Sequence, residues 1–255
     1  MPLLESLGSA SARGTGMFGQ ISYAQALPNT ISNLAAWYTA DSWTGSSWTD
    51  LSGNGRNATS YYGSIAKNTT YSNQNGANKP FTVISSINAD GGIRLPADLD
   101  ANANYTFFNV TRRIGATTGG NETLRGRIWD GLGDNWLSGF HAGSSGVAYH
   151  MNWITPESAT GYDTYGNNWT INTDQLNLFR TNGVRYGPNN TAGTVAASTT
   201  ITFHYGNYAG VGGTGTEKGA WAVAEAIWFT RELSATEYKL VEGYLANKYG
   251  MTITV

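Results

Sequence analysis

The clearest structural pattern of the chain lies in Trp221-Ala-Val-Ala-Glu-Ala-Ile-Trp-Phe-Thr230, continued by Arg231-Glu-Leu-Ser-Ala-Thr-Glu-Tyr-Lys-Leu-Val-Glu-Gly-Tyr-Leu-Ala-Asn-Lys-Tyr-Gly250. Its first half is apolar on both faces, which predicts a central strand covered from both sides. With a period of two, one face carries Trp221, Val223, Glu225, Ile227 and Phe229. Small residues on the other face indicate that another layer approaches closely; this face carries Ala222, Ala224, Ala226 and Trp228.

The second half of the stretch predicts a helix over residues 235–249. Ser234 is the N-cap and Glu237 follows three positions later, which is the pattern of a capping box. Gly250 ends the helix at a position where a left-handed residue is favoured. Apolar residues recur at spacings of three and four and form a single stripe, namely Tyr238, Val241, Leu245 and Tyr249. We therefore expect the helix to pack on a sheet.

Upstream of this stretch the sequence is typical of short strands separated by Gly-rich turns. The strongest hairpin signal is Asn182-Gly183, because both residue types tolerate the positive φ angles of a type I′ turn. Many short strands followed by one helix predict an all-β fold, a β sandwich with a C-terminal capping helix. The expected strands are 34–39, 103–113, 125–130, 136–141, 147–153, 176–181, 184–186 and 200–205.

The composition excludes several classes of protein. Charged residues make up 13% of the 255 residues, about half of the roughly 25% that is usual in soluble domains. A net charge of −2 and a pI of about 5.9 argue against nucleic-acid binding. The absence of cysteine excludes disulfides and thiolate metal sites. Since the sequence has no run of 18 apolar residues, we expect no membrane-spanning segment and no membrane partner.

Two further segments carry a family resemblance. Leu34-Ala-Ala-Trp-Tyr-Thr-Ala-Asp-Ser-Trp43 and Ser47-Trp-Thr-Asp-Leu-Ser-Gly-Asn-Gly-Arg-Asn-Ala-Thr59 resemble the opening of concanavalin A-like (laminin G-like) jelly-roll domains, and residues 222–250 resemble their last strand and closing helix. The middle of the chain is similar to versions found in structural proteins of aquatic viruses and phages; its matching segments are Asn135-Trp-Leu-Ser-Gly-Phe-His141 and Gly146-Val-Ala-Tyr-His150. The resemblance implies a jelly-roll domain over residues 29–255.

Residues 1–28 have no strand or helix period, and we interpret them as an extended N-terminal arm. They lack the pattern of a secretory signal. The predicted assembly anchor consists of apolar residues without a local partner and one arginine, namely Leu3, Leu4, Leu7, Arg13, Met17 and Phe18. Together with the viral resemblance, the arm favours a virion structural protein such as a capsid-decoration, minor capsid or fibre-type component. It would be made in the host cytoplasm, bind capsid or tail proteins through the arm within a symmetric assembly, and be exposed on the particle exterior.

The titratable residues show no catalytic or metal-binding pattern, so we predict no enzyme, no cofactor and no metal. A glycosidase needs two carboxylates, and the Glu-x-Asp-x-x-Glu pattern of laminarinase-like members is absent. We expect Glu225 to be buried and satisfied by an arginine or by the backbone. His141 and His150 are expected on neighbouring strands, close together, and as ordinary half-buried residues like His204. A calcium site from Asp41, Asp50 and Asp163 is the remaining metal hypothesis.

The alternative function is a carbohydrate-binding lectin module, and a glycoside hydrolase ranks behind it. Sugar binding requires aromatic faces beside polar groups, and the chain has both at Trp43, Trp48, Tyr61, Tyr62, Trp153, Tyr162, Tyr165 and Trp169. Gly161-Tyr-Asp-Thr-Tyr-Gly-Asn-Asn-Trp169 is the densest such loop. The candidate glycan-binding residues are therefore Tyr162, Asp163, Tyr165, Asn167 and Trp169, and host surface glycans are the expected ligands.

Overall fold

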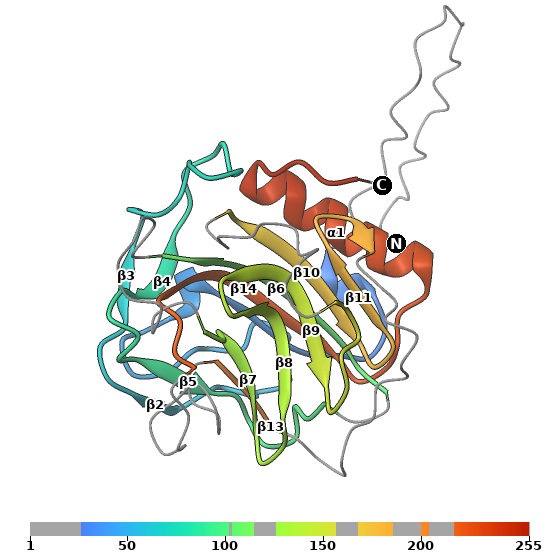
Figure 1. The fold of residues 1–255 in the computed structure, drawn as a ribbon, viewed down its shortest axis with the longest axis horizontal. Coiled ribbons are helices and arrows are strands. Elements are labelled where there is room, and N and C mark those ends of the chain that lie inside the picture. Colours follow the sequence, from blue (N-terminus) through green and yellow to red (C-terminus); the bar gives the residue numbers. More distant parts are fainter. Residues whose placement is uncertain are drawn as a thin grey trace, which may run out of the picture.

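The computed structural model describes residues 27–101, 104–114, 126–156, 168–185 and 217–254, together with the backbone of 200–203. The described residues form two antiparallel sheets and one α-helix (Figure 1). The strands are β1 (Leu34–Thr39), β2 (Ser60–Tyr62), β3 (Ala66–Asn68), β4 (Val83–Ser86), β5 (Gly92–Arg94), β6 (Thr106–Arg113), β7 (Trp129–Leu132), β8 (Trp136–His141), β9 (Ser144–His150), β10 (Thr170–Gln175), β11 (Leu178–Thr181), β12 (Val184–Arg185), β13 (Thr200–Phe203) and β14 (Trp221–Phe229). The helical elements are η1 (Pro28–Thr30), η2 (Ala40–Ser42) and α1 (Ala235–Tyr249).

The predicted β sandwich with a C-terminal helix is confirmed. One sheet has eight strands in the order β12-β11-β10-β6-β14-β4-β3, with β1 also paired to β14. The other has six strands in the order β2-β5-β13-β7-β8-β9. Among the residues that the structure describes, no helix has the length and apolar character needed to cross a membrane.

Strand β14 is the central strand that its sequence predicts, and all nine of its residues are buried. It pairs with β6 along one side, while β4 and β1 share its other side. The core between the sheets contains tightly packed aromatic rings. Tyr105 stacks on Trp228 with ring centroids 5.0 Å apart, and Phe107 meets Trp129 edge-on at 4.8 Å.

A β-bulge corrects the predicted faces of β14. The register against β6 shifts between Val223 and Glu225, so that the alternation of side chains changes there. Before the bulge Trp221 and Val223 face the inter-sheet core, and after it Ala226 and Trp228 do so. The opposite face, under the helix, carries Ala222, Ala224, Ile227 and Phe229. The bulge therefore places Glu225 on the helix side instead of in the inter-sheet core.

Helix α1 covers the outer face of the eight-stranded sheet (Figure 1). Its predicted stripe is confirmed, because Val241, Leu245 and Tyr249 are buried in the cluster formed with that sheet. Ala222 and Ala224 of β14 belong to the same buried cluster as the helix residues. Gly250 has a φ of 63° and ends the helix in the left-handed conformation, as predicted.

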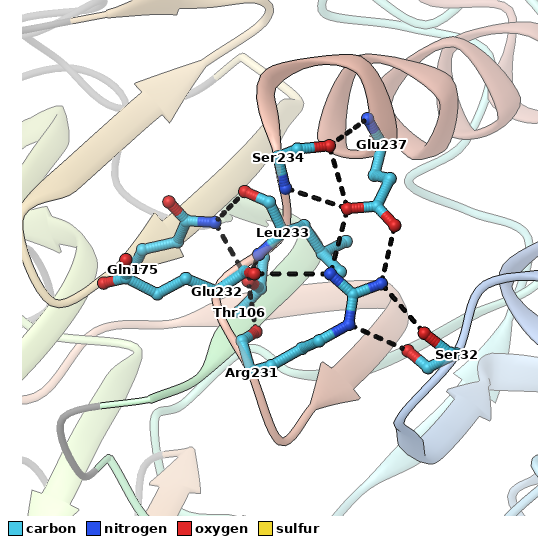
Figure 2. A network of polar contacts seen from close by, with 8 residues as sticks. All are labelled: Ser32, Thr106, Gln175, Arg231, Glu232, Leu233, Ser234 and Glu237. Carbon is cyan, nitrogen blue, oxygen red and sulfur yellow. Dashed lines mark hydrogen bonds and ion pairs between the residues drawn. The ribbon is translucent and has the colours of Figure 1, made fainter.

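The start of the helix is fixed by the predicted capping box. The Glu237 amide donates to Ser234 Oγ, and the Ser234 amide donates to the Glu237 carboxylate at 2.9 Å. Figure 2 shows that Arg231 binds the same carboxylate. Its Nη2 donates to Glu237 Oε1 at 2.6 Å and to Ser32 Oγ at 3.1 Å. The hydroxyl of Thr106 accepts from the Leu233 amide at 2.9 Å. The chain entering the helix is thus tied to β6 and to the segment before β1.

The Asn182-Gly183 hairpin is also confirmed. Both residues have positive φ angles, 47° and 80°, and they join β11 to β12. A side chain at position 183 would collide with the backbone, because its Cβ would lie 1.8 Å from the Thr254 carbonyl oxygen. The turn therefore requires glycine for both its conformation and its packing.

Candidate functional site

Most of the tryptophans proposed from the sequence as sugar contacts are structural. A sugar ring needs an accessible aromatic face, whereas the tryptophans at 43, 48 and 169 are buried. Tyr61 is 40% exposed. Tyr62 and Trp153 are half-buried. The described surface therefore offers fewer aromatic faces than the composition suggests.

Trp169 requires a correction, because we predicted it as part of a glycan-binding loop. The residue lies directly before β10 and is fully buried. Its indole donates a hydrogen bond to the Tyr71 carbonyl oxygen at 3.0 Å, and its ring packs against Phe81 at 5.1 Å. The apolar ring thus stabilises the outer core, where a sugar has no access to it.

The other predicted site residues lie outside the described residues. They are the loop residues Tyr162, Asp163, Tyr165 and Asn167 and the anchor residues Leu3, Leu4, Leu7, Arg13, Met17 and Phe18. The division at residue 28 and the roles of both groups therefore stay predictions.

Among the described residues, a hollow lies at one edge of the sandwich. Strand β2 ends the six-stranded sheet and β3 ends the eight-stranded sheet, and both lie on the same side of the molecule (Figure 1). The chain crosses from one sheet to the other between them. Here a hollow of about 410 Å³, which we call the edge hollow, is lined by Trp43, Gly45, Tyr61, Gly63, Ser64, Ile65 and Ala66.

Close backbone packing fixes the floor of the edge hollow. Gly63 has a φ of 64°, and a Cβ on it would lie 1.7 Å from the Asp90 carbonyl oxygen. The turn beneath it is tied by Ser86, whose hydroxyl accepts from the Gly91 amide at 3.0 Å. Only glycine fits at position 63, so the backbone on this side of the edge hollow packs directly against the backbone of residue 90.

The opposite wall is held by a lysine. Lys67 on β3 donates from Nζ to the carbonyl oxygens of Asp41 at 2.6 Å and Trp43 at 3.0 Å. Trp43 in turn meets Tyr61 at right angles, with ring centroids 5.4 Å apart. Tyr61 is therefore supported from behind by a buried ring and is exposed toward solvent. A phenol in this setting offers an apolar ring and a hydroxyl that both donates and accepts hydrogen bonds.

A second aromatic and charged cluster lies on the six-stranded sheet, and the sequence analysis did not assemble it. Trp153 meets Tyr149 at 5.1 Å and His141 at 5.3 Å, both edge-on. His141 Nε2 lies 3.6 Å from Glu217 Oε2, and the same carboxylate oxygen accepts from Arg127 Nε at 2.6 Å. Arg127 forms an isolated parallel bridge with Lys218, and its amide donates to the Glu217 carbonyl oxygen at 3.0 Å; this contact between distant segments has no signal in a single sequence.

The two histidines predicted to be neighbours lie at opposite ends of one hairpin. His141 pairs with Ser144 beside the turn, whereas His150 pairs with Trp136 at the far end of β8 and β9. An antiparallel hairpin separates its first and last pairs by its full length, so the two histidines cannot share a ligand.

His150 belongs to the inter-sheet core. The residue is fully buried, with Nε2 3.1 Å from Asp174 Oδ1 and Nδ1 3.0 Å from the Leu176 carbonyl oxygen. Asp174 Oδ1 also accepts from the hydroxyl of Tyr105 at 2.8 Å. Burial and the Asp174 charge raise the pKa of Tyr105 well above its ordinary value. The histidine ring stacks on Trp136 at 5.8 Å, so this network joins β6, β9 and β10 within the core.

Glu225 is buried as expected, but its charge partner is a lysine instead of an arginine. Lys248 Nζ donates to Oε2 at 2.5 Å, and Trp37 Nε1 donates to Oε1 at 2.6 Å. The hydroxyls of Tyr249 and Tyr244 donate to the same carboxylate. Burial and the negative charge of Glu225 raise the pKa of Tyr249 well above its ordinary value. This carboxylate joins α1 to the bulge of β14.

The acids of the calcium hypothesis are not assembled in the described residues. Asp50 is buried and accepts hydrogen bonds from the amides of Trp37 at 2.9 Å, Ser52 at 2.9 Å and Arg56 at 3.0 Å. Its oxygens thus shape the loop that follows. Across the described ranges, no three His, Asp or Glu side chains gather in the manner of a metal site, and Asp163 lies beyond those ranges.

No family model and no curated protein matches this sequence, whereas solved structures resemble its fold. Trypanosoma rangeli sialidase in complex with sialic acid matches 86% of this chain with a TM-score of 0.52 and 14% identity. A mutant of that sialidase displaying trans-sialidase activity matches 87% with a TM-score of 0.54 and 13% identity. The receptor-binding domain of botulinum neurotoxin mosaic serotype C/D matches 85% with a TM-score of 0.51 and 13% identity.

These similarities show the fold alone, which is a β sandwich. The chain spans 33% of the sialidase and 51% of the toxin domain. The viral form of the resemblance receives no support from them and stays a prediction.

One prediction is contradicted by these structures. We predicted that the chain is not an enzyme, whereas the solved structures that it resembles include sialidases, which are enzymes. The lack of a Glu-x-Asp-x-x-Glu pattern, on which the prediction rested, excludes one arrangement of carboxylates only. That pattern is therefore too narrow a basis for excluding catalysis on this fold.

Proposed function

We propose that this β sandwich binds carbohydrate and that the edge hollow receives the sugar. The observation that carries the proposal is Tyr61, which is 40% exposed, supported from behind by Trp43, and beside a hollow of about 410 Å³. A sugar ring has an apolar face and a hydroxyl rim. The edge hollow offers the matching chemistry, with the tyrosine ring for the apolar face and Ser64 for the rim.

Pre-organisation of the hollow supports the proposal. Gly63 fixes one wall by backbone contact, and Lys67 fixes the backbone of Trp43 on the other. A site that is already formed loses little conformational entropy when it binds, so weak contacts with a neutral sugar add up to measurable affinity. The edge of β2 also offers backbone N–H and C=O groups for hydrogen bonds to a ligand, because in the described residues this strand pairs only with β5.

The structural similarities add a second line of support. One of the similar structures is a sialidase in complex with sialic acid, and another is a receptor-binding domain. A β sandwich exposes loops and sheet edges that can contact a ligand.

A glycan array with the full chain tests the proposal, with Tyr61→Ala as the site variant. We expect the parent to bind a defined set of glycans and Tyr61→Ala to lose about tenfold in affinity or more, equivalent to about 1.4 kcal/mol. The matched control is Leu27→Ala, which removes an exposed apolar side chain directly before η1, away from both aromatic clusters.

Trp153→Ala tests an alternative location of the sugar site, because Trp153 and Tyr149 form a second partly exposed aromatic cluster. Loss of binding in Tyr61→Ala alone supports the edge hollow. Loss in Trp153→Ala alone would move the site to that cluster and overturn the assignment. A parent protein that binds no glycan would overturn carbohydrate binding itself.

The virion role is a separate proposal about residues 1–28. Its support is the apolar content of the arm and the resemblance of the middle segments. Deleting residues 2–20 is expected to leave a folded, soluble sandwich that no longer joins its assembly. Normal incorporation of the truncated protein into particles would contradict the anchoring role.

A further inference from the structure

A second hollow lies at the other end of the β2–β5 pair. Its volume is about 290 Å³. The lining residues, which define what we call the Arg94 hollow, are Asn57, Ala58, Thr59, Ser60, Arg94, Leu95, Pro96 and Ala97. Arg94 is the one charged side chain among them, and amide and hydroxyl groups surround it. Arg94 and Ser60 are cross-strand partners, so they project from the same face of the sheet.

The charge of Arg94 has no counter-charge in the described part of the chain. Four other described arginines pair with carboxylates, namely Arg56 with Asp98, Arg127 with Glu217, Arg180 with Glu242 and Arg231 with Glu237, whereas the buried Arg112 donates to backbone carbonyl oxygens. The acid nearest in sequence to the hollow, Asp98, is engaged by Arg56 at 2.5 Å. Arg94 is half-buried and lines the hollow, so its side chain is reached both from the hollow and from solvent.

The two hollows share strand β2. Ser60 lines the Arg94 hollow, whereas Tyr61 and Gly63 line the edge hollow. From residue 60 to residue 63 the chain advances by about 10 Å at roughly 3.3 Å per residue. Because β2 is the last strand of its sheet, a chain-like ligand that follows this edge reaches both faces of the strand.

We propose that the ligand is an acidic oligosaccharide whose carboxylate binds Arg94 while a neighbouring sugar ring packs on Tyr61. This inference rests on the proposed function and adds the class of substrate. The planar guanidinium presents two parallel N–H groups that match a carboxylate. The protein carries a net charge of −2, so its overall field does not attract anions. Selectivity for an acidic glycan therefore comes from this one residue.

The test compares matched ligands on the full chain by isothermal titration calorimetry. The probes are one uronic-acid oligosaccharide, its methyl ester, which has the same ring without the charge, and a sulfated oligosaccharide of the same length. The variants are Arg94→Gln and Arg94→Lys. The control is Arg185→Gln, which removes the same charge from an exposed position on β12, in the other sheet.

We expect the parent to bind the uronic acid at least tenfold more tightly than the methyl ester. Arg94→Gln should remove that difference and leave the affinity for the ester unchanged, whereas Arg185→Gln should preserve it. Arg94→Lys should retain part of the difference, because a lysine keeps the charge but lacks the two-pronged geometry. Equal thermal denaturation midpoints of the variants and the parent would show that the changes in affinity are local.

Several outcomes would overturn the inference while leaving carbohydrate binding intact. They are equal affinities of the parent for acid and ester, an equal effect of Arg94→Gln and Arg185→Gln, and a preference for the sulfated probe. Loss of binding to every glycan on the array would instead overturn the proposed function, so the two failures are distinguishable.

Discussion

The face under α1 and the open edge at β2 contain similar residues in opposite circumstances. Under the helix, aromatic rings are buried and charges are paired, as Glu225 is with Lys248 and Glu242 with Arg180. At the β2 edge, Tyr61 is exposed and Arg94 has no carboxylate beside it in the described residues.

The contrast separates residues that stabilise the fold from residues that remain available for a ligand. A buried charge under the helix that loses its partner is poorly solvated in a low-dielectric environment, so substitution of either partner lowers the stability of the fold. Tyr61 and Arg94 keep contact with water, and the fold does not depend on their polar groups. We therefore expect substitutions under the helix to affect unfolding and substitutions at the edge to affect binding.

Val241→Asp should have the largest effect on stability. Val241 is fully buried between α1 and the sheet, so the new carboxylate would lack both water and a partner. The expected loss is about 3–5 kcal/mol, measured by urea denaturation. The control is Asn247→Asp, which adds the same charge on the exposed side of the helix. Equal midpoints for the two variants would show that α1 is not docked.

Lys248→Met should lower stability by about 2 kcal/mol. It leaves Glu225 buried with hydrogen bonds from Trp37 and the tyrosines but without a cation. The loss is smaller than for a fully buried pair because the lysine side chain is 33% exposed. The double variant with Glu225→Gln should recover part of the loss in chemical denaturation. A double variant that is less stable than Lys248→Met would contradict the pairing.

Ser234→Ala should lower stability by about 1 kcal/mol, because the amide of Glu237 loses its acceptor. Ser234→Thr is the conservative control, since threonine keeps a hydroxyl that accepts from the Glu237 amide and donates to the Glu237 carboxylate, and it should retain most of the stability. Thermal unfolding of the three proteins measures the difference. An alanine variant as stable as the parent would show that the cap observed in Figure 2 contributes nothing.

The free energy of unfolding at acidic pH should depend on Glu237. The guanidinium of Arg231 and the Ser234 amide lower the pKa of Glu237 from 4.5 to about 2. Because the folded-state pKa is the lower one, this contribution is complete above about pH 4.5 and disappears as the pH falls toward 2. Glu237→Gln should flatten the pH dependence of the unfolding midpoint in that range. A variant with the parent's slope would contradict it. The effect is modest, because the pair is partly exposed.

Arg94→Gln should have the smallest effect on stability, within about 0.5 kcal/mol of the parent, and Tyr61→Ala should cost about 1 kcal/mol because it removes the edge-on contact with Trp43. Both side chains reach solvent, and Arg94 is in no ion pair within the described ranges. Urea midpoints measured beside the binding assays would establish the separation. A loss of 2 kcal/mol or more in either variant would mean that the edge is part of the structural core.

Local patterns in the sequence predicted the parts of the fold that depend on local interactions. The capping box at Ser234, the turn at Asn182-Gly183 and the stripe through Val241 are each decided by residues a few positions apart. The bulge at Glu225 was missed, because an extra residue in one strand becomes evident only when its partner strand is known. The predicted faces of β14 were therefore wrong beyond that point.

The candidate site was predicted less well than the fold. Tyr61 was one of eight aromatic candidates, and nothing near it in sequence distinguishes it from Trp48, which is fully buried. Exposure depends on which strands end a sheet, and β2 to β5 are too short to show a pattern. Arg94 has no local feature at all, because what distinguishes it is its place beside a hollow that segments distant in the sequence form.

Binding of a sugar at the β2 edge should be visible in the amide chemical shifts of the protein. The ¹⁵N-labelled full chain is titrated with the glycan that binds most strongly on the array. We expect the shifts to concentrate at residues 60–66 and 92–97, with saturation at a single affinity. Shifts confined to residues 149–153, or spread evenly over the molecule, would contradict it.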